Sequence, residues 1–280
     1  MKLHTINTGM FKLDGGAMFG VVPKSLWSKQ NPADDINMCS WAMRCLLIED
    51  GDKLILIDSG LGDKQDAKFF SYYYLWGEDS LIKSIRALGF EPEDITHNLL
   101  THLHFDHCGG SVKWNKDHTG YETTFPNATY LVGKEHWDLA LHPNSREKAS
   151  FLKENLLPMQ EAGQLQLLEN ETELFPGISF KYVFGHTDGM LIPHIKYKDK
   201  TIVYMADLLP AHYYIPIPWV MAYDTRPLIT MEEKETFLPE AAAKDYILFF
   251  EHDPTVECCT VQQTDRGVKV KDTFKLDELM

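Results

Sequence analysis

The chain has 280 residues, of which 44% are hydrophobic, and its formal net charge is −14 at pH 7. This length and composition allow a full hydrophobic core and argue against a disordered or fibrous protein. The acidic balance disfavours nucleic acid as a partner, and no apolar run of 18 residues predicts a membrane span.

The N-terminal part of the chain lacks a regular apolar period. Residues 1–14 contain no apolar stretch typical of a secretory signal. Residues 15–40 carry several large apolar side chains without helical or strand spacing. We expect this segment to be either a loop that packs on its own core or an apolar lid or dimer arm. The second interpretation favours a homodimer.

Strands and helices are then predicted in clusters. Residues 43–49 and 53–58 indicate a hairpin with its turn at 50–52, and helical spacing at 78–88 ends at Gly89. Helical segments are also expected at 133–157, with a break near Pro143, and at 230–243, where Glu232 to Glu235 should form a solvated face. The remaining predicted strands are 97–100, 128–132, 178–184, 191–197, 201–206 and 246–250.

This alternation favours the α+β class. Clusters of strands with helices between them fit two packed sheets covered by helices, a four-layer αββα sandwich. No linker interrupts the pattern, so residues 1–280 are expected to form a single domain, with the irregular apolar arm or lid at about 15–40.

The most specific motif follows the predicted strand at 97–100 and reads HLHFDH at 102–107. On an extended segment His102 and His104 point to the same side, and a turn lets Asp106 and His107 face the same cavity. Imidazole nitrogens and carboxylate oxygens are ligands of Zn²⁺, and also of Mn²⁺, Fe and Co²⁺. The motif therefore predicts a metal site.

Further metal-ligating side chains stand at the ends of later predicted strands. His186, Asp207 and His252 each follow such a strand, and Asp58 ends the strand at 53–58. A single histidine at a strand end is more often structural than functional. The complete set, in this order, extends the predicted metal site.

With these residues the sequence resembles the metallo-β-lactamase superfamily over about residues 40–254. The signature HxHxDH matches 102–107. The resemblance implies two divalent ions, expected to be zinc, and it implies that Asp58 orients the ligands. One ion would be held by His102, His104 and His186, the other by Asp106, His107 and His252, and Asp207 would bridge both.

Segments around these residues are similar to the quorum-quenching N-acyl homoserine lactonases. They read GHTDGM at 185–190, DLLPAH at 207–212 and IPWVMAYD at 217–224. The similarity implies opening of a lactone ring by a metal-bound hydroxide, with Asp106 and Asp207 in the catalytic set. Many lactonases have a tyrosine where this chain has Pro210. His212, Tyr213 and Tyr223 are alternative hydrogen-bond donors, of which His212 and Tyr223 are our catalytic candidates.

Other functions remain open on the same site. A phosphotriesterase or arylesterase, or a glyoxalase-II-like thioesterase, would use the same ligands on another small ester, and a slow-turnover binding or sensing protein would keep the metals. An acyl chain could pack on Tyr72, Tyr73, Trp76 and the 15–40 segment. The five cysteines include no CxxC pair and favour free thiols in a reducing cytoplasm.

Overall fold

The computed structural model describes residues 1–279, and the chain divides into two compact units. The first unit comprises Met1–Gly9 and Met43–Asn170. The second comprises Met10–Ala42 and the chain from Glu171 onward. Each unit contains a β-sheet with helices packed on it, which agrees with the predicted α+β class. The expectation of one domain over residues 1–280 stays a prediction.

The first unit is built mainly on a six-stranded sheet with the order β1-β2-β3-β4-β7-β8. β2 and β3 form the predicted hairpin, whose turn holds Gly51 at φ 63°, a conformation that favours glycine. β3, β4, β7 and β8 run parallel, so their carboxyl ends meet at one edge. The strands are β1 (Lys2–Asp14), β2 (Met38–Asp50), β3 (Lys53–Ile57), β4 (His97–Leu99), β7 (Thr129–Gly133) and β8 (Leu165–Leu168).

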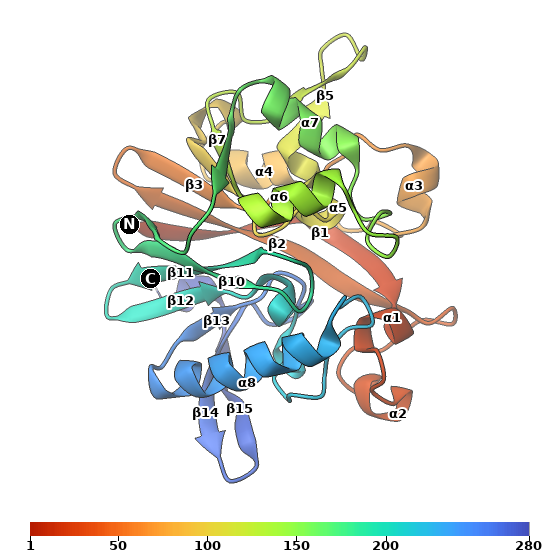
Figure 1. Ribbon diagram of the computed structural model, residues 1–280, viewed down its shortest axis with the longest axis vertical. Helices are drawn as coiled ribbons and strands as arrows, with labels where there is room; N and C mark the ends of the chain where they lie inside the picture. The colour runs from red at the N-terminus through yellow and green to blue at the C-terminus, as the bar shows by residue number, and fades with distance from the viewer. Residues whose placement is uncertain (280) are drawn as a thin grey trace. The chain divides into compact units, whose positions relative to one another are not determined.

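Short helices and one small hairpin complete the first unit (Figure 1). In α4 (Leu81–Ala87) the Ser80 side chain accepts from the backbone N–H of Lys83, and Leu81 and Ile85 are buried one turn apart. The helical region predicted at 133–157 is interrupted more widely than expected, since α6 ends at Leu141 and α7 begins at Lys153. The elements are α3 (Ala67–Ser71), η1 (Pro92–Asp94), α5 (Phe105–Cys108), η2 (Gly109–Ser111), β5 (Val112–Trp114), β6 (Tyr121–Thr123), α6 (Lys134–Leu141) and α7 (Lys153–Glu161).

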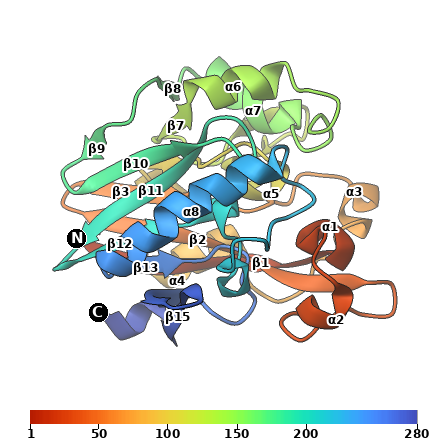
Figure 2. The ribbon, with the colours of Figure 1, turned by 60° about the horizontal axis from the view of Figure 1, so that its bottom comes forward.

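The second unit contains a seven-stranded sheet with the order β15-β14-β13-β12-β11-β10-β9. The long helix α8 (Pro227–Ala243) packs on this sheet (Figure 2). The other elements are β9 (Glu173–Phe175), β10 (Ile178–Val183), β11 (Met190–Tyr197), β12 (Lys200–Tyr204), η3 (Ala206–Leu208), η4 (His212–Tyr214), β13 (Ile247–Phe249), β14 (Cys258–Thr264), β15 (Gly267–Phe274) and η5 (Leu276–Leu279).

The charged run in α8 was predicted to form a solvated face, and for two of its residues this was wrong. Lys234 is fully buried, and its Nζ donates to the carbonyl oxygens of Pro216, Ile217 and Trp219 at 2.8–3.1 Å. Glu233 is partly buried and accepts from the backbone N–H of Gly185. Backbone groups of neighbouring loops therefore replace water around these two side chains.

The segment at 15–40 contains two short helices, α1 (Gly15–Phe19) and α2 (Lys24–Trp27). Within the second unit, Phe19 stacks on Trp27 and on Tyr214, with ring centroids 4.8 and 5.5 Å apart. Four large apolar side chains of this segment are buried: Met18, Phe19, Val22 and Trp27. Three others are exposed: Val21, Leu26 and Ile36. These contacts favour the interpretation of a segment packed on its own core, and a lid or dimer arm stays a prediction.

Two whole-chain features bear on the sequence predictions. None of the helices in residues 1–279 is both long enough and apolar enough to cross a membrane. All five cysteines are buried. Burial raises the pKa of the Cys108 thiol to about 12, so this cysteine is held as a neutral thiol next to the motif at 102–107.

Candidate functional site

In the first unit, Asp58 and His102 follow the parallel strands β3 and β4, so both residues lie at the same sheet edge. Asp58 is fully buried. One of its carboxylate oxygens accepts from the backbone N–H of Thr101 and the other from the Thr101 hydroxyl, each at 2.7 Å. His107 Nδ1 also lies 3.1 Å from this carboxylate. These contacts agree with the predicted role of Asp58 in orienting a ligand.

The first two histidines of the motif turn ring nitrogens toward one another. His102 Nε2 lies 3.1 Å from His104 Nδ1. Two nitrogen ligands of a tetrahedral zinc ion lie about 3.3 Å apart, given Zn–N bonds of ~2.0–2.1 Å. On the far side of each ring, His102 Nδ1 lies 3.1 Å from Thr101 Oγ1 and His104 Nε2 lies 3.6 Å from Glu147 Oε1. This pair of imidazoles therefore fits a shared cation.

Asp106 and His107 lie on the short helix α5, so the turn expected after His104 is helical. The turn begins at His104, whose carbonyl oxygen accepts from the backbone N–H of His107 and Cys108. His107 Nε2 faces Asp106 at 3.9 Å, while its Nδ1 faces Asp58. The helical turn thus places His107 between one carboxylate that orients it and a second that could share a metal ion with it.

Two glycines after α5 are required by close backbone packing. A Cβ atom on Gly109 would lie 2.1 Å from the carbonyl oxygen of Leu61, and one on Gly110 would lie 2.1 Å from that of Ser59. Glycine therefore lets the chain after the motif pass directly against the loop that follows Asp58. This contact fixes the motif relative to β3.

In the second unit, Asp207 lies between two histidines. Its Oδ2 is 3.1 Å from His186 Nε2, and its Oδ1 is 3.2 Å from His252 Nε2. The residue before it, Ala206, has a φ of 42°, a strained conformation for a residue with a side chain. Each oxygen of the Asp207 carboxylate therefore lies beside a different imidazole.

The outer nitrogens of these two histidines are also held. His186 Nδ1 lies 2.9 Å from Asp224 Oδ1, and His252 Nδ1 donates to the carbonyl oxygen of Ala42 at 2.8 Å. Burial alone would lower the pKa of His186, but the carboxylates of Asp207 and Asp224 outweigh it and raise the pKa to about 10. This group of side chains therefore favours a positive charge, which a divalent cation would supply.

The other predicted catalytic residues also lie in the second unit. Asp253 Oδ2 accepts from the His212 backbone N–H at 3.0 Å and from His212 Nδ1. Burial alone would raise the pKa of Asp253, but the hydrogen bonds from His212 and nearby backbone groups hold it below its usual value. Tyr223 is 42% exposed and directly precedes Asp224. Tyr213 is buried, and its hydroxyl accepts from Asn31.

Two carboxylates that lie beside histidine nitrogens were not predicted from the sequence. Asp224 lies 38 residues after His186, and Glu147 lies 43 residues after His104 (147 − 104). Neither follows a predicted strand. Asp224 ends the lactonase-like segment at 217–224, but that similarity assigned it no role. The buried His136 accepts from the backbone N–H of Leu103 through Nε2 at 2.7 Å, which fits a structural role.

Comparison with known proteins finds a matching family and several similar chains. The family model described as the metallo-beta-lactamase superfamily matches residues 44–252. An N-acyl homoserine lactonase from a Bacillus species is 25% identical over 283 residues, with 96% of both chains covered. A solved structure from Staphylococcus aureus, described as a probable metal-dependent hydrolase, has a TM-score of 0.88 and 32% identity, covering 98% of this chain and 96% of that chain.

A second solved structure is similar in fold. It is AidC, a dizinc quorum-quenching lactonase in complex with its product, and it has a TM-score of 0.78 at 23% identity. The match covers 98% of this chain and 95% of that chain. The likeness in fold therefore extends across both units of the chain.

Proposed function

Because the chain belongs to the metallo-β-lactamase superfamily and is a metal-dependent hydrolase, we propose that it opens lactone rings such as those of N-acyl homoserine lactones. The family match agrees with the α+β metallo-β-lactamase fold predicted from the sequence. The substrate is the part of the proposal that rests on similarity, since the superfamily fold supports many hydrolytic reactions.

The observation that carries the proposed two-metal site is the position of Asp207. Its two carboxylate oxygens lie 3.1 and 3.2 Å from the imidazoles of His186 and His252. A carboxylate whose two oxygens face different histidines suits a bridge between two cations. Each cation would also bind one of these histidines. We assign one ion to His102, His104 and His186, the other to Asp106, His107 and His252, and the bridge to Asp207.

The donor set of five imidazoles and two carboxylates fits zinc, and also manganese, iron or cobalt. Two such ions would lower the pKa of bound water toward neutrality and would polarise an ester carbonyl. Within their own units, each of the five imidazoles has a polar group beside its outer nitrogen. These groups are Thr101, Glu147, Asp58, Asp224 and the Ala42 carbonyl.

We further propose that His212 hydrogen-bonds the leaving oxygen of the substrate or gives it a proton. Asp253 accepts from His212 Nδ1, which leaves Nε2 for the substrate. The His212 side chain is 24% exposed, so a ligand can reach it. Tyr223 is a second candidate, because it is exposed beside Asp224, the partner of His186.

In the first unit, an aromatic group beside the motif is a candidate for holding an acyl chain. The ring centroids of Tyr73 and Phe105 are 4.8 Å apart, and those of Phe69 and Phe105 are 5.4 Å apart. Phe105 belongs to α5, next to Asp106. Tyr72 and Trp76 are about half exposed and remain candidates for the same role.

A substrate panel at equal enzyme concentration tests the proposed activity. Short- and long-chain acyl homoserine lactones, a paraoxon-type phosphotriester, an aryl ester and a glutathione thioester would be compared with the zinc-loaded chain. Acid release from lactones should exceed hydrolysis of every other substrate by at least about tenfold in kcat/KM. Faster turnover of any other ester would reject the lactonase assignment, and tight product binding without turnover would favour a binding protein.

A further inference from the structure

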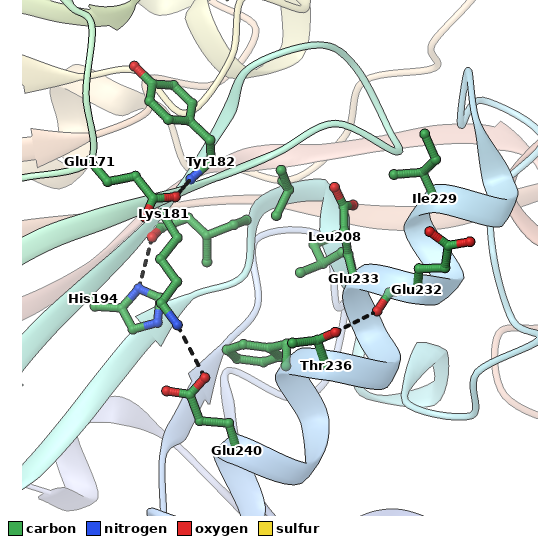
Figure 3. Close-up of a pocket in the computed structure, with 13 residues that line it drawn as sticks. Glu171, Lys181, Tyr182, His194, Leu208, Ile229, Glu232, Glu233, Thr236 and Glu240 are labelled. Atoms are coloured by element: carbon green, nitrogen blue, oxygen red, sulfur yellow. Dashed lines mark hydrogen bonds and ion pairs between the residues drawn. The ribbon is translucent and has the colours of Figure 1, made fainter.

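A cavity of about 290 Å³ lies in the second unit between α8 and the strands β10 and β11 (Figure 3). Its volume is close to the lower limit of ordinary small-molecule sites, ~300–1,000 Å³. Apolar side chains form much of its wall: Val183, Ile192, Leu208, Ile229 and Phe237. Among the described residues that line it there is none of the seven proposed metal ligands.

His194 on β11 gives this cavity a specific polar group. The side chain is 8% exposed, and its Nδ1 donates to the carbonyl oxygen of Ile192 at 2.9 Å, so Nε2 is an acceptor. Within residues 1–279, His194 Nε2 has no hydrogen-bond partner. Burial lowers the pKa of His194 and so favours the neutral ring. A buried acceptor in this state gains free energy when a donor is bound.

The charged groups around the cavity favour a cation over an anion. Four glutamates line it (Glu171, Glu232, Glu233 and Glu240), against one lysine, Lys181. The lysine is already paired, because its Nζ lies 3.2 Å from Glu240 Oε2. Glu232 is exposed on α8 and contributes a carboxylate near the opening. The lining therefore carries surplus negative charge.

We propose that this cavity is a second ligand site, which binds a small organic amine. The amine N–H donates to His194 Nε2, and the apolar body of the ligand packs on Ile192, Leu208 and Phe237. A ligand that carries a carboxylate is excluded by the surplus negative charge. The proposal does not depend on the hydrolytic function proposed above, because it uses none of the metal-ligating residues.

Binding of three matched probes to the zinc-loaded full chain tests this site. Benzylamine, benzyl alcohol and benzoate share one ring and differ in charge, and ligand-observed NMR titration would measure their affinities. Thr236→Trp should fill the cavity and weaken benzylamine binding at least about tenfold, whereas Glu235→Trp, on an exposed and non-lining position of the same helix, should not. His194→Phe should weaken it about five- to tenfold, through loss of one hydrogen bond.

The probes should bind in the order benzylamine, benzyl alcohol, benzoate. Failure of benzylamine to bind the wild-type chain would overturn the proposal. So would benzylamine binding that survives Thr236→Trp, because the probe would then occupy another place, such as the metal ions. Benzoate binding that matches benzylamine and is lost in Thr236→Trp would overturn the choice of an amine. If His194→Phe does not fold, the pair of tryptophan variants decides the outcome.

Discussion

The contact between Asp224 and His186 places a negative charge behind a proposed metal ligand. The two side chains are 2.9 Å apart and both are buried. Asp224→Asn keeps the shape but removes the charge, so we expect zinc affinity to fall about tenfold or more. Competition with a chromophoric chelator would measure this affinity. Asp265→Asn, an exposed control in a turn of the same unit, should leave it unchanged, and equal affinities for both variants would contradict the proposed role.

The pairing of His212 with Asp253 predicts a catalytic rather than a structural phenotype. His212→Gln should lower kcat for the lactone about 10²-fold or more while changing KM little. The reason is that His212 is proposed to bond the leaving oxygen as the ring opens. His142→Gln, at an exposed histidine, serves as the control. A folded His212→Gln variant with the kcat of wild type would exclude His212 from the mechanism.

At this scale the sequence predicted the ligands but not their neighbours. Four of the proposed ligands each lie just after a strand that the apolar pattern predicted: His102, His186, Asp207 and His252. The order of the ligands in the superfamily then identified these four residues as candidates. Asp224 and Glu147 reach their histidines only through tertiary folding, across 38 and 43 residues. No local pattern marks a residue whose role is created by a distant partner.

At the scale of an element, the turn α5 depends on the glycines that follow it. A Cβ on Gly110 would meet the Ser59 carbonyl oxygen at 2.1 Å and the Leu81 side chain at 2.7 Å. We expect Gly110→Ala to lower the free energy of unfolding by about 1–3 kcal/mol or more. Urea unfolding would measure the change. Gly120→Ala, where the nearest atom is 3.7 Å away, should change it by less than about 0.5 kcal/mol, and equal losses would refute the packing argument.

The buried lysine of α8 predicts a pH-dependent stability. Burial lowers the pKa of Lys234 from 10.5 to about 7. Between these two pH values the unfolded chain binds more protons than the folded chain, so the contribution of Lys234 to the unfolding free energy rises with pH. Urea unfolding at pH 7 and pH 9.5 should show wild type gaining stability relative to Lys234→Met. The difference in unfolding free energy between wild type and Lys196→Met, a variant at an exposed position, should be the same at both pH values.

The elements missed from the sequence share a physical cause. β1 contains Gly9 and mixes polar and apolar side chains without strict alternation, so its pairing in the sheet had to come from tertiary contacts. α1 begins with two glycines, which are poor helix formers, and is held by the Asp14 side chain, which accepts from the backbone N–H of Ala17. By contrast, α8 has helical spacing and starts at a proline, a favoured first residue.

At the scale of the whole molecule, the superfamily match spans residues 44–252 and thus includes every proposed metal ligand. The fold class could be predicted because strands and helices alternate in clusters, and because the ligand motif is specific to the family. The division into two compact units could not, since residues 10–42 belong with the C-terminal part of the chain. That assignment follows from packing, such as the stacking of Phe19 on Tyr214, rather than from order along the chain.

Metal content per chain tests the central proposal most directly. Emission spectrometry on zinc-loaded protein, freed of loosely bound ions, would be applied to wild type and to Asp207→Ala, with circular dichroism to confirm folding. We predict about two ions in wild type, and one or fewer in the variant, because the carboxylate beside both His186 and His252 is lost. One ion in wild type, or two ions retained by a folded Asp207→Ala variant, would contradict the two-metal site.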